Sequence, residues 1–206
     1  MLRTEALGAR TEELIRVGRF FFERGWVPAT AGNFSARLDA DHVVLTASGR
    51  HKGELEAEGF LVVTPDGQVL PPGGKPSAET ALHLMLYRRE PRLGAVLHTH
   101  SRPATLLSRL SPRGVVLEGY EVQKALPGVD SHTARVEVPV FPNDQDIPRL
   151  ASRVEDFLRG HPDTSGYLIE GHGLYTWGRT VAEARRHVEA FEFLFECELD
   201  LRRLTR

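Results

Sequence analysis

The stretch of residues 94–100, Gly-Ala-Val-Leu-His-Thr-His, combines a strand pattern with two histidines. Its short apolar run is typical of a buried strand, and two histidines close it. Because side chains alternate between the two faces of a strand, His98 and His100 share a face and could bind one cation. The alternative is that both histidines only close the strand, and for an isolated His-x-His motif the two interpretations have about equal weight.

A third ligand would decide between these interpretations, and the sequence offers His172. It lies between Gly171 and Gly173, at the junction of two predicted strands, where a tight backbone could turn the ring toward the first pair. Two or three histidines with a carboxylate or water suit Zn²⁺ or a similar divalent ion, and an open coordination position marks a catalytic site.

The other six histidines give weaker signals. His83, on a predicted helix, could support a metal ligand from behind, although packing at the edge of the core is the commoner role of such a histidine. The remaining five show no ligand geometry and are predicted at the surface or in loops: His42, His51, His132, His161 and His187.

Helices and strands alternate on both sides of residues 94–100. Helix caps are predicted at Ser77, Asp146 and Thr180, the last as a capping box with Glu183. The sequence has no internal repeat and no low-complexity linker. Together with the alternation of helices and strands, this predicts one α/β domain over residues 1–206, with helices packed against a mixed sheet. The predicted helices are 11–24, 77–89, 147–160 and a long C-terminal one from Thr180, and the predicted strands are 33–38, 42–46, 60–64, 68–70, 94–100, 115–117, 134–140, 167–170 and 174–177.

Two glutamates are candidates for acid–base chemistry. Glu79 is predicted in the first turn of the helix capped by Ser77, where a carboxylate can equally complement the helix dipole. Glu121 follows the histidine pair along the chain and could equally be a solvated surface residue. Neither position alone distinguishes the two roles.

Short turns of glycine, serine and asparagine lie at predicted strand ends and at one helix start. Their N–H and hydroxyl groups can donate to a phosphate, although ordinary turn chemistry would select the same residues. The sequence has no Walker or dinucleotide-binding fingerprint. The candidate phosphate donors are Gly32, Asn33, Ser48, Gly49 and Ser77.

The composition narrows the class of protein. With 206 residues, 41% of them hydrophobic, and a net charge of -2, the chain can bury a core and has no basic tract for nucleic acid. No segment has the roughly 18 uninterrupted apolar residues of a membrane span, and no signal peptide is evident, so we expect a soluble cytoplasmic protein that does not bind membranes. The single cysteine, Cys197, cannot form an intramolecular disulfide.

Five short motifs stand out along the chain: Thr-Ala-Gly-Asn-Phe-Ser (30–35), Thr-Ala-Ser-Gly (46–49), Pro-Ser-Ala-Glu (76–79), His-Thr-His (98–100) and Gly-His-Gly (171–173). In this order they resemble the motifs of the class II, zinc-dependent aldolase and epimerase superfamily, and the resemblance extends over nearly the whole chain. It implies a three-layer α/β/α fold with a mixed, largely antiparallel sheet, a homotetramer, and one Zn²⁺ per subunit held by His98, His100 and His172.

Two longer stretches, 117–126 and 170–178, resemble the branch of this superfamily that dehydrates 5-methylthioribulose 1-phosphate to 2,3-diketo-5-methylthiopentyl 1-phosphate in methionine salvage. In that branch the glutamate matching Glu121 is the proposed acid or base, whereas in the sugar-phosphate aldolases the glutamate matching Glu79 has that role. We therefore rank Glu121 first and Glu79 second. Ala78 replaces the second serine of the aldolase Ser-Ser-Glu motif, which removes one phosphate donor.

The resemblance also implies a mechanism. Zinc would stabilise the negative charge that develops on the substrate's C2 oxygen when the C3 proton leaves, and Glu121 would move protons and help the C4 hydroxyl leave as water. The alternative is a class II aldolase or 4-epimerase of another ketose or pentulose phosphate, in which the C3–C4 bond breaks. A non-catalytic interaction domain, as in the adducin head, is a third hypothesis, which the presence of all three expected histidines disfavours.

Overall fold

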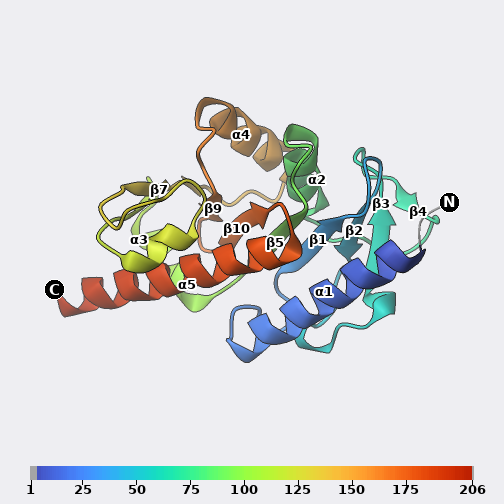
Figure 1. Cartoon of the computed structure of the whole chain (residues 1–206), viewed down its shortest axis with the longest axis horizontal. Coiled ribbons are helices and arrows are strands. Elements are labelled where there is room, and N and C mark those ends of the chain that lie inside the picture. The colour runs from blue at the N-terminus through green and yellow to red at the C-terminus, as the bar shows by residue number, and fades with distance from the viewer. Residues whose placement is uncertain (1–3, 206) are drawn as a thin grey trace.

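A mixed eight-stranded sheet lies at the centre of the computed structural model, which describes residues 4–205 (Figure 1). The strand order is β4-β3-β2-β1-β5-β10-β9-β8, and all neighbours are antiparallel except the parallel pair β8 and β9. A separate ribbon pairs β6 with β7. The strands are β1 (Asn33–Arg37), β2 (Val43–Thr46), β3 (Phe60–Val63), β4 (Val69–Leu70), β5 (Ala95–Thr99), β6 (Val115–Leu117), β7 (Val136–Val138), β8 (Val140–Phe141), β9 (Gly166–Ile169) and β10 (Gly173–Gly178).

Helices cover both faces of the sheet. Val96 of β5 packs in the core beneath α2 and α4, whereas Ala95 and Leu97 of the same strand pack in the core beneath α1 and α5. The third core cluster joins α3 to α5 and to the β6–β7 ribbon. This arrangement confirms the predicted three-layer α/β/α fold. The helices are α1 (Thr4–Glu23), α2 (Thr80–Arg89), α3 (Arg102–Leu110), α4 (Ile147–Gly160) and α5 (Val181–Leu204).

Two helices begin elsewhere than predicted. α1 starts at Thr4 rather than residue 11, because good helix formers extend it and Leu7 packs partly buried against the core. α2 starts at Thr80 rather than Ser77, and Glu79 is its N-cap residue. The backbone carbonyl of Ser77, not its side chain, accepts hydrogen bonds from both the N–H and the hydroxyl of Thr80.

Local signals were missed or misjudged in three places. Ser101 caps α3 by accepting from the N–H of Ala104, and the predicted elements do not include this helix. The single predicted strand 134–140 is two strands, because Pro139 has no N–H for a ladder and divides β7 from β8. Thr180 caps α5 as predicted, but the Glu183 carboxylate accepts from the N–H of Arg179 instead of closing the capping box.

Among the described residues, no helix is long and apolar enough to cross a lipid bilayer.

Candidate functional site

Four side chains that could hold a metal ion converge at the C-terminal end of β5. One ligand atom from each of Glu79, His98, His100 and His172 lies within 4.8 Å of the other three. His98 belongs to β5, His100 follows that strand, Glu79 precedes α2, and His172 precedes β10. Because β10 pairs antiparallel with β5, the loop that carries His172 arrives at the end of β5 where the other histidines lie. The fold thus brings together the three histidines predicted as ligands and one predicted carboxylate.

The tautomer of His98 leaves a lone pair facing this cluster. Its Nδ1–H donates to the carbonyl oxygen of Leu174 (2.8 Å), so the neutral ring has no proton on Nε2. That Nε2 lies 3.3 Å from Nε2 of His172 and 3.2 Å from a carboxylate oxygen of Glu79. Nε2 of His172 in turn lies 3.2 Å from Nε2 of His100. These imidazole nitrogens and the carboxylate point at one another, and both groups are ligands of divalent metal ions, so the donor set fits such an ion.

Burial keeps two of the histidines in the form that binds metals. It lowers the pKa of His98 well below its ordinary value, although the charge of Glu79 acts in the opposite direction. Burial likewise lowers the pKa of His100 to about 4. A neutral imidazole has no proton to release before it coordinates, so both rings are ready to bind a metal ion at pH 7.

Glu79 is held at the cluster by two donors. One carboxylate oxygen accepts from Nδ2 of Asn33 (2.6 Å) and from the hydroxyl of Tyr175 (2.8 Å), and the other lies 2.9 Å from Nε2 of His172. Burial raises the pKa of Glu79, but the hydrogen bonds that its carboxylate accepts from His172 and Asn33 favour the ionised form, and this pKa lies below its ordinary value. Glu79 is therefore an ionised carboxylate that could bind the metal or accept a proton beside it.

A chain of buried hydrogen bonds supports Glu79 from behind. Tyr87 donates to Oγ of Ser35 (3.0 Å), Ser35 donates to Nδ1 of His83 (2.7 Å), and Nε2–H of His83 donates to Oδ1 of Asn33. Burial lowers the pKa of His83 to about 4 and raises the pKa of Tyr87, so the ring is neutral and the phenol keeps its proton. His83 is both a core residue and a support for the cluster, the two roles that its sequence position left open.

The two glycines beside His172 serve different purposes. Gly171 has a φ of 63°, in the left-handed region that other residues rarely adopt. Gly173 has an ordinary φ, but a Cβ there would lie 1.9 Å from the carbonyl oxygen of Thr99. β10 therefore approaches β5 closely at this point, which holds His172 against the histidines of β5.

Replacing Gly173 with alanine is expected to lower the free energy of unfolding by about 3 kcal/mol or more, because the backbone of β10 must move away from β5. Gly171→Ala has room for its Cβ and is expected to lose about 1 kcal/mol through the left-handed conformation alone. Urea denaturation of the two variants measures the difference. Equal, small losses would show that β10 separates from β5 without strain.

Two of the loops with predicted phosphate donors lie side by side. The N–H of Ser48 donates to the carbonyl oxygen of Lys75 (2.9 Å), so the loop 46–49 lies against the segment that leads to Ser77 and Glu79. Oγ of Ser77 accepts from the N–H of Glu79 at 3.3 Å, which places this serine beside the cluster.

The third loop packs directly on the strand that carries the histidines. A Cβ at Gly32 would lie 2.7 Å from the carbonyl oxygen of His98. Among the hydrogen bonds between residues 4 and 205, none has the N–H of Gly32 or Gly49 as its donor, so both amides can still donate to a ligand. The side-chain amide of Asn33, in contrast, is engaged in the buried chain of hydrogen bonds behind Glu79.

The structure places Glu121, the first-ranked acid or base, outside this cluster. It begins the short 3-10 helix η3 (Glu121–Ala125), which packs against α5. Its side chain is 69% exposed and forms an ion pair with Lys124, which lowers the pKa of Glu121. Within one chain, Glu79 and not Glu121 is the glutamate among the groups that converge with the histidines.

Three buried polar residues near the site were missed. The ring of Tyr175 stacks on His98 with centroids 3.9 Å apart, and Lys52 is 2% exposed beside the phosphate-donor loops. Glu192 of α5 accepts from the hydroxyl of Thr99 (2.6 Å) on the opposite face of β5. Burial raises the pKa of Glu192 to about 7. Glu192 had a sequence signal, since it is a carboxylate on the apolar side of a helix, whereas Lys52 and Tyr175 had none.

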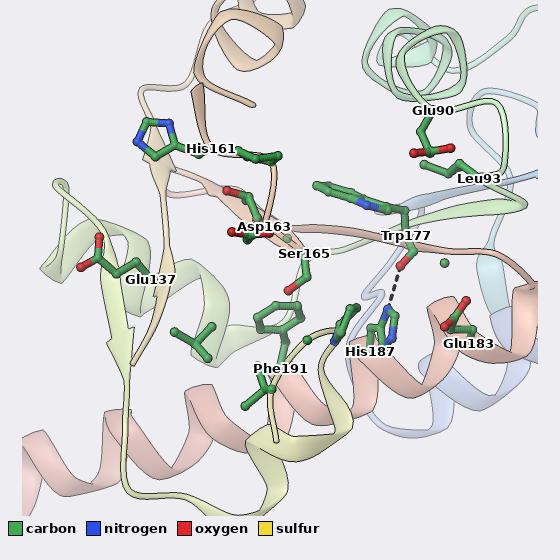
Figure 2. A pocket seen from close by; sticks show the side chains of 18 of the residues that line it. Glu90, Leu93, Glu137, His161, Asp163, Ser165, Trp177, Glu183, His187 and Phe191 are labelled. Atoms are coloured by element: carbon green, nitrogen blue, oxygen red, sulfur yellow. Dashed lines mark hydrogen bonds between the residues drawn. The ribbon is translucent and has the colours of Figure 1, made fainter. Parts of the chain in front are cut away.

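A separate cavity of about 850 Å³ lies near the other end of β5 and β10, where Trp177 pairs with Val96 (Figure 2). No residue of the four-residue cluster lines it. His187 borders it and is 1% exposed, with its Nδ1–H donated to the carbonyl oxygen of Trp177 (2.7 Å; Figure 2). The prediction of a surface His187 is wrong, because this residue lies on the side of α5 that packs against β10. The other four histidines predicted at the surface or in loops are exposed or half-buried.

Comparisons with known proteins agree with this architecture. Residues 12–199 match the family model described as Class II Aldolase and Adducin N-terminal domain. A Marinobacter nauticus protein named methylthioribulose-1-phosphate dehydratase is 56% identical over 197 residues, which cover 95% of each chain. A protein of the same name from Pseudomonas aeruginosa is 58% identical over 198 residues, 95% of this chain and 96% of that protein.

Solved structures show the same fold. The chain is similar to YgbL from Escherichia coli, with a TM-score of 0.80 and 29% identity over 96% of this chain and 91% of that one. It is also similar to the L-fuculose-1-phosphate aldolase of Thermus thermophilus, with a TM-score of 0.78 and 28% identity over 96% of each chain.

Proposed function

The chain belongs to the class II aldolase and adducin N-terminal domain family, and on this premise we propose that it is a lyase of methionine salvage. It removes water from 5-methylthioribulose 1-phosphate and forms 2,3-diketo-5-methylthiopentyl 1-phosphate. The observation that carries this proposal is the cluster of three histidines and Glu79 in a chain 56–58% identical to proteins named methylthioribulose-1-phosphate dehydratase.

We assign the metal ligands to His98, His100 and His172, and the metal to Zn²⁺, one per subunit. Three imidazoles with one open position are typical of catalytic zinc, and Glu79 lies close enough to be a fourth ligand or to contact a bound water. When bound, the ion supplies Lewis-acid stabilisation of negative charge on a substrate oxygen. The hydrogen bond from His98 to Leu174 orients its ring for this role.

The protein's carboxylates move the protons. Glu121 takes the proton from C3 and helps the C4 hydroxyl leave as water, and the resulting enol tautomerises to the 2,3-diketone. Its 69% exposed carboxylate is not held by the cluster of its own chain. We therefore propose that Glu121 serves the site of a neighbouring copy in a homotetramer. Glu79 is the second candidate for the same proton transfers.

The phosphate is proposed to lie against the backbone donors at Gly32 and Gly49 and the hydroxyls of Ser48 and Ser77. Two contacts support this proposal: loop 46–49 is tied to the segment before Ser77, and Gly32 packs on β5. Asn33 acts at this site through its hold on Glu79. A phosphate fixed there sets the position of C2, C3 and C4 relative to the carboxylates.

A class II aldolase or epimerase of another ketose phosphate is the second candidate. The position of Glu79 inside the cluster favours it, because a carboxylate beside the metal is available to the substrate without a second chain. The likeness to the Thermus thermophilus aldolase, at 28% identity, is weaker than the likeness to the dehydratases.

An assay of the purified, zinc-loaded protein tests the proposal. We expect 5-methylthioribulose 1-phosphate to lose water to the diketone, and a chelator to abolish the reaction. Release of dihydroxyacetone phosphate from fuculose or rhamnulose 1-phosphate, without dehydration, would instead favour an aldolase with Glu79 as the acid or base. A pure protein with far less than one zinc per chain, and no recovery on zinc addition, would favour a non-catalytic domain.

A further inference from the structure

Lys52 is a buried cation that the proposed mechanism does not use. It begins the short helix η1 (Lys52–Glu54) and is 2% exposed. Its Nζ donates to the carbonyl oxygens of Thr30 (2.7 Å) and Arg50 (2.5 Å). An ammonium has three N–H donors, so one donor remains after these two bonds.

This ammonium contacts two of the phosphate-donor loops, 30–33 and 46–49, at or next to their ends. Thr30 comes two residues before Gly32, and Arg50 comes directly after Gly49. The Lys52 ammonium therefore forms a hydrogen bond with each of these two loops, next to their candidate phosphate donors. Burial disfavours this charge, and the Glu79 carboxylate of the cluster acts in the opposite direction.

No ion pair within residues 4–205 involves Lys52. The ion pairs of the chain's surface lysines and arginines lie elsewhere, for example at Arg10, Arg16, Arg92, Arg159 and Arg203. A buried cation without a carboxylate partner is unfavourable, because carbonyl dipoles replace only part of its lost hydration. Burial accordingly lowers the pKa of Lys52 to about 8. A doubly charged anion bound between the loops would supply the missing counter-charge.

We propose that Lys52 is the cationic group of the phosphate subsite, with its remaining N–H directed at a phosphate held between the loops 30–33 and 46–49. This inference rests on the proposed function for the identity of the substrate, but the anion site itself does not depend on the reaction. A charged hydrogen bond of this kind distinguishes a phosphorylated substrate from the same sugar without phosphate. Lys52 therefore contributes substrate selectivity, and it is not an acid or base for the reaction.

The simpler alternative is that Lys52 only ties the two loops together. Three variants separate the roles. Lys52→Met removes both charge and donors, Lys52→Gln keeps a donor for a loop carbonyl without the charge, and Lys52→Arg keeps the charge. Arg92→Met, which removes an exposed cation with 74% side-chain exposure, is the matched control.

The anion site can be tested without the reaction. Each zinc-loaded variant is titrated with inorganic phosphate in a calorimeter, which measures the affinity for phosphate. We expect Lys52→Met and Lys52→Gln to bind phosphate about 10- to 100-fold more weakly, and Lys52→Arg and Arg92→Met to stay within a few-fold of the unchanged protein. Thermal unfolding identifies any variant that fails to fold, and the remaining Lys52 variants then carry the test.

Steady-state kinetics provides the second measurement. With 5-methylthioribulose 1-phosphate, we expect Lys52→Gln to raise KM by a similar factor and to change kcat little, as for an interaction equal in the ground and transition states. Unchanged phosphate affinity in folded Lys52→Gln would overturn the inference and leave only the loop-tying role. If the unchanged protein binds phosphate but does not dehydrate 5-methylthioribulose 1-phosphate, and the Lys52 variants lose phosphate binding, the anion site is supported and the proposed function fails.

Discussion

Replacing His172 with alanine is expected to lower the rate of dehydration by about 10³ or more and to reduce bound zinc far below one ion per chain. The variant removes the imidazole whose Nε2 lies within 3.3 Å of both other histidines, so the remaining donors cannot surround the ion. Lewis-acid stabilisation contributes several kcal/mol to such a reaction, and each 1.36 kcal/mol is a factor of ten in rate. Metal analysis and the diketone assay measure the two effects.

His161→Ala is the matched control for this prediction, since His161 is exposed and donates from its ring to the carbonyl oxygen of Phe157, away from the cluster. The control should keep both its zinc and its rate. If His172→Ala retained a full complement of zinc and a rate within a few-fold of the unchanged protein, His172 would not be a required ligand.

Replacing Glu121 with glutamine is expected to lower kcat by about 10² to 10⁴, the usual contribution of a positioned acid or base, with zinc content and thermal stability unchanged. Stability should hold because the side chain is exposed and its ion pair with Lys124 is at the surface. Glu118→Gln, at a nearby carboxylate with 54% side-chain exposure, is the control and should keep the full rate.

The proposal that Glu121 serves a neighbouring copy can be tested by mixing. Two inactive variants, Glu121→Gln and His172→Ala, should regain part of the activity when they are assembled into mixed tetramers, because some sites then combine an intact cluster with an intact Glu121. A rate near that of the unchanged protein for Glu121→Gln would refute its assignment, and Glu79→Gln would then be the variant to measure.

Local sequence patterns predicted most elements of the fold. Asp146 followed by Pro148 predicted α4, whose cap is formed by the Asp146 side chain and the N–H of Arg149. The apolar run before His98 predicted β5, which lies in the interior of the sheet between β1 and β10. Both signals are local, since a cap and an apolar run act over a few neighbouring residues.

The errors occurred where a local signal competed with packing. Ser77 has the chemistry of a cap, yet α2 starts at Thr80, and the side chain of Glu79 faces the histidines instead. His187 has a polar ring in a charged stretch, yet it is buried because it lies on the side of α5 that packs against β10. Such outcomes depend on which face of an element meets the core, and that choice requires the neighbouring elements.

Periodicity, caps and the His-x-His and Gly-His-Gly spacings are short-range properties, and they predicted an α/β domain and three candidate histidines for a metal site. The three-layer arrangement and the complete ligand set were implied by the family resemblance. The tertiary structure places Glu79 among those histidines within one chain, although the family resemblance ranked Glu121 first as the acid or base. It also decided that Asn33 holds Glu79 and that Lys52 lies buried between two loops. These contacts join residues far apart in the chain, and their energies depend on burial and distance, which no local pattern records.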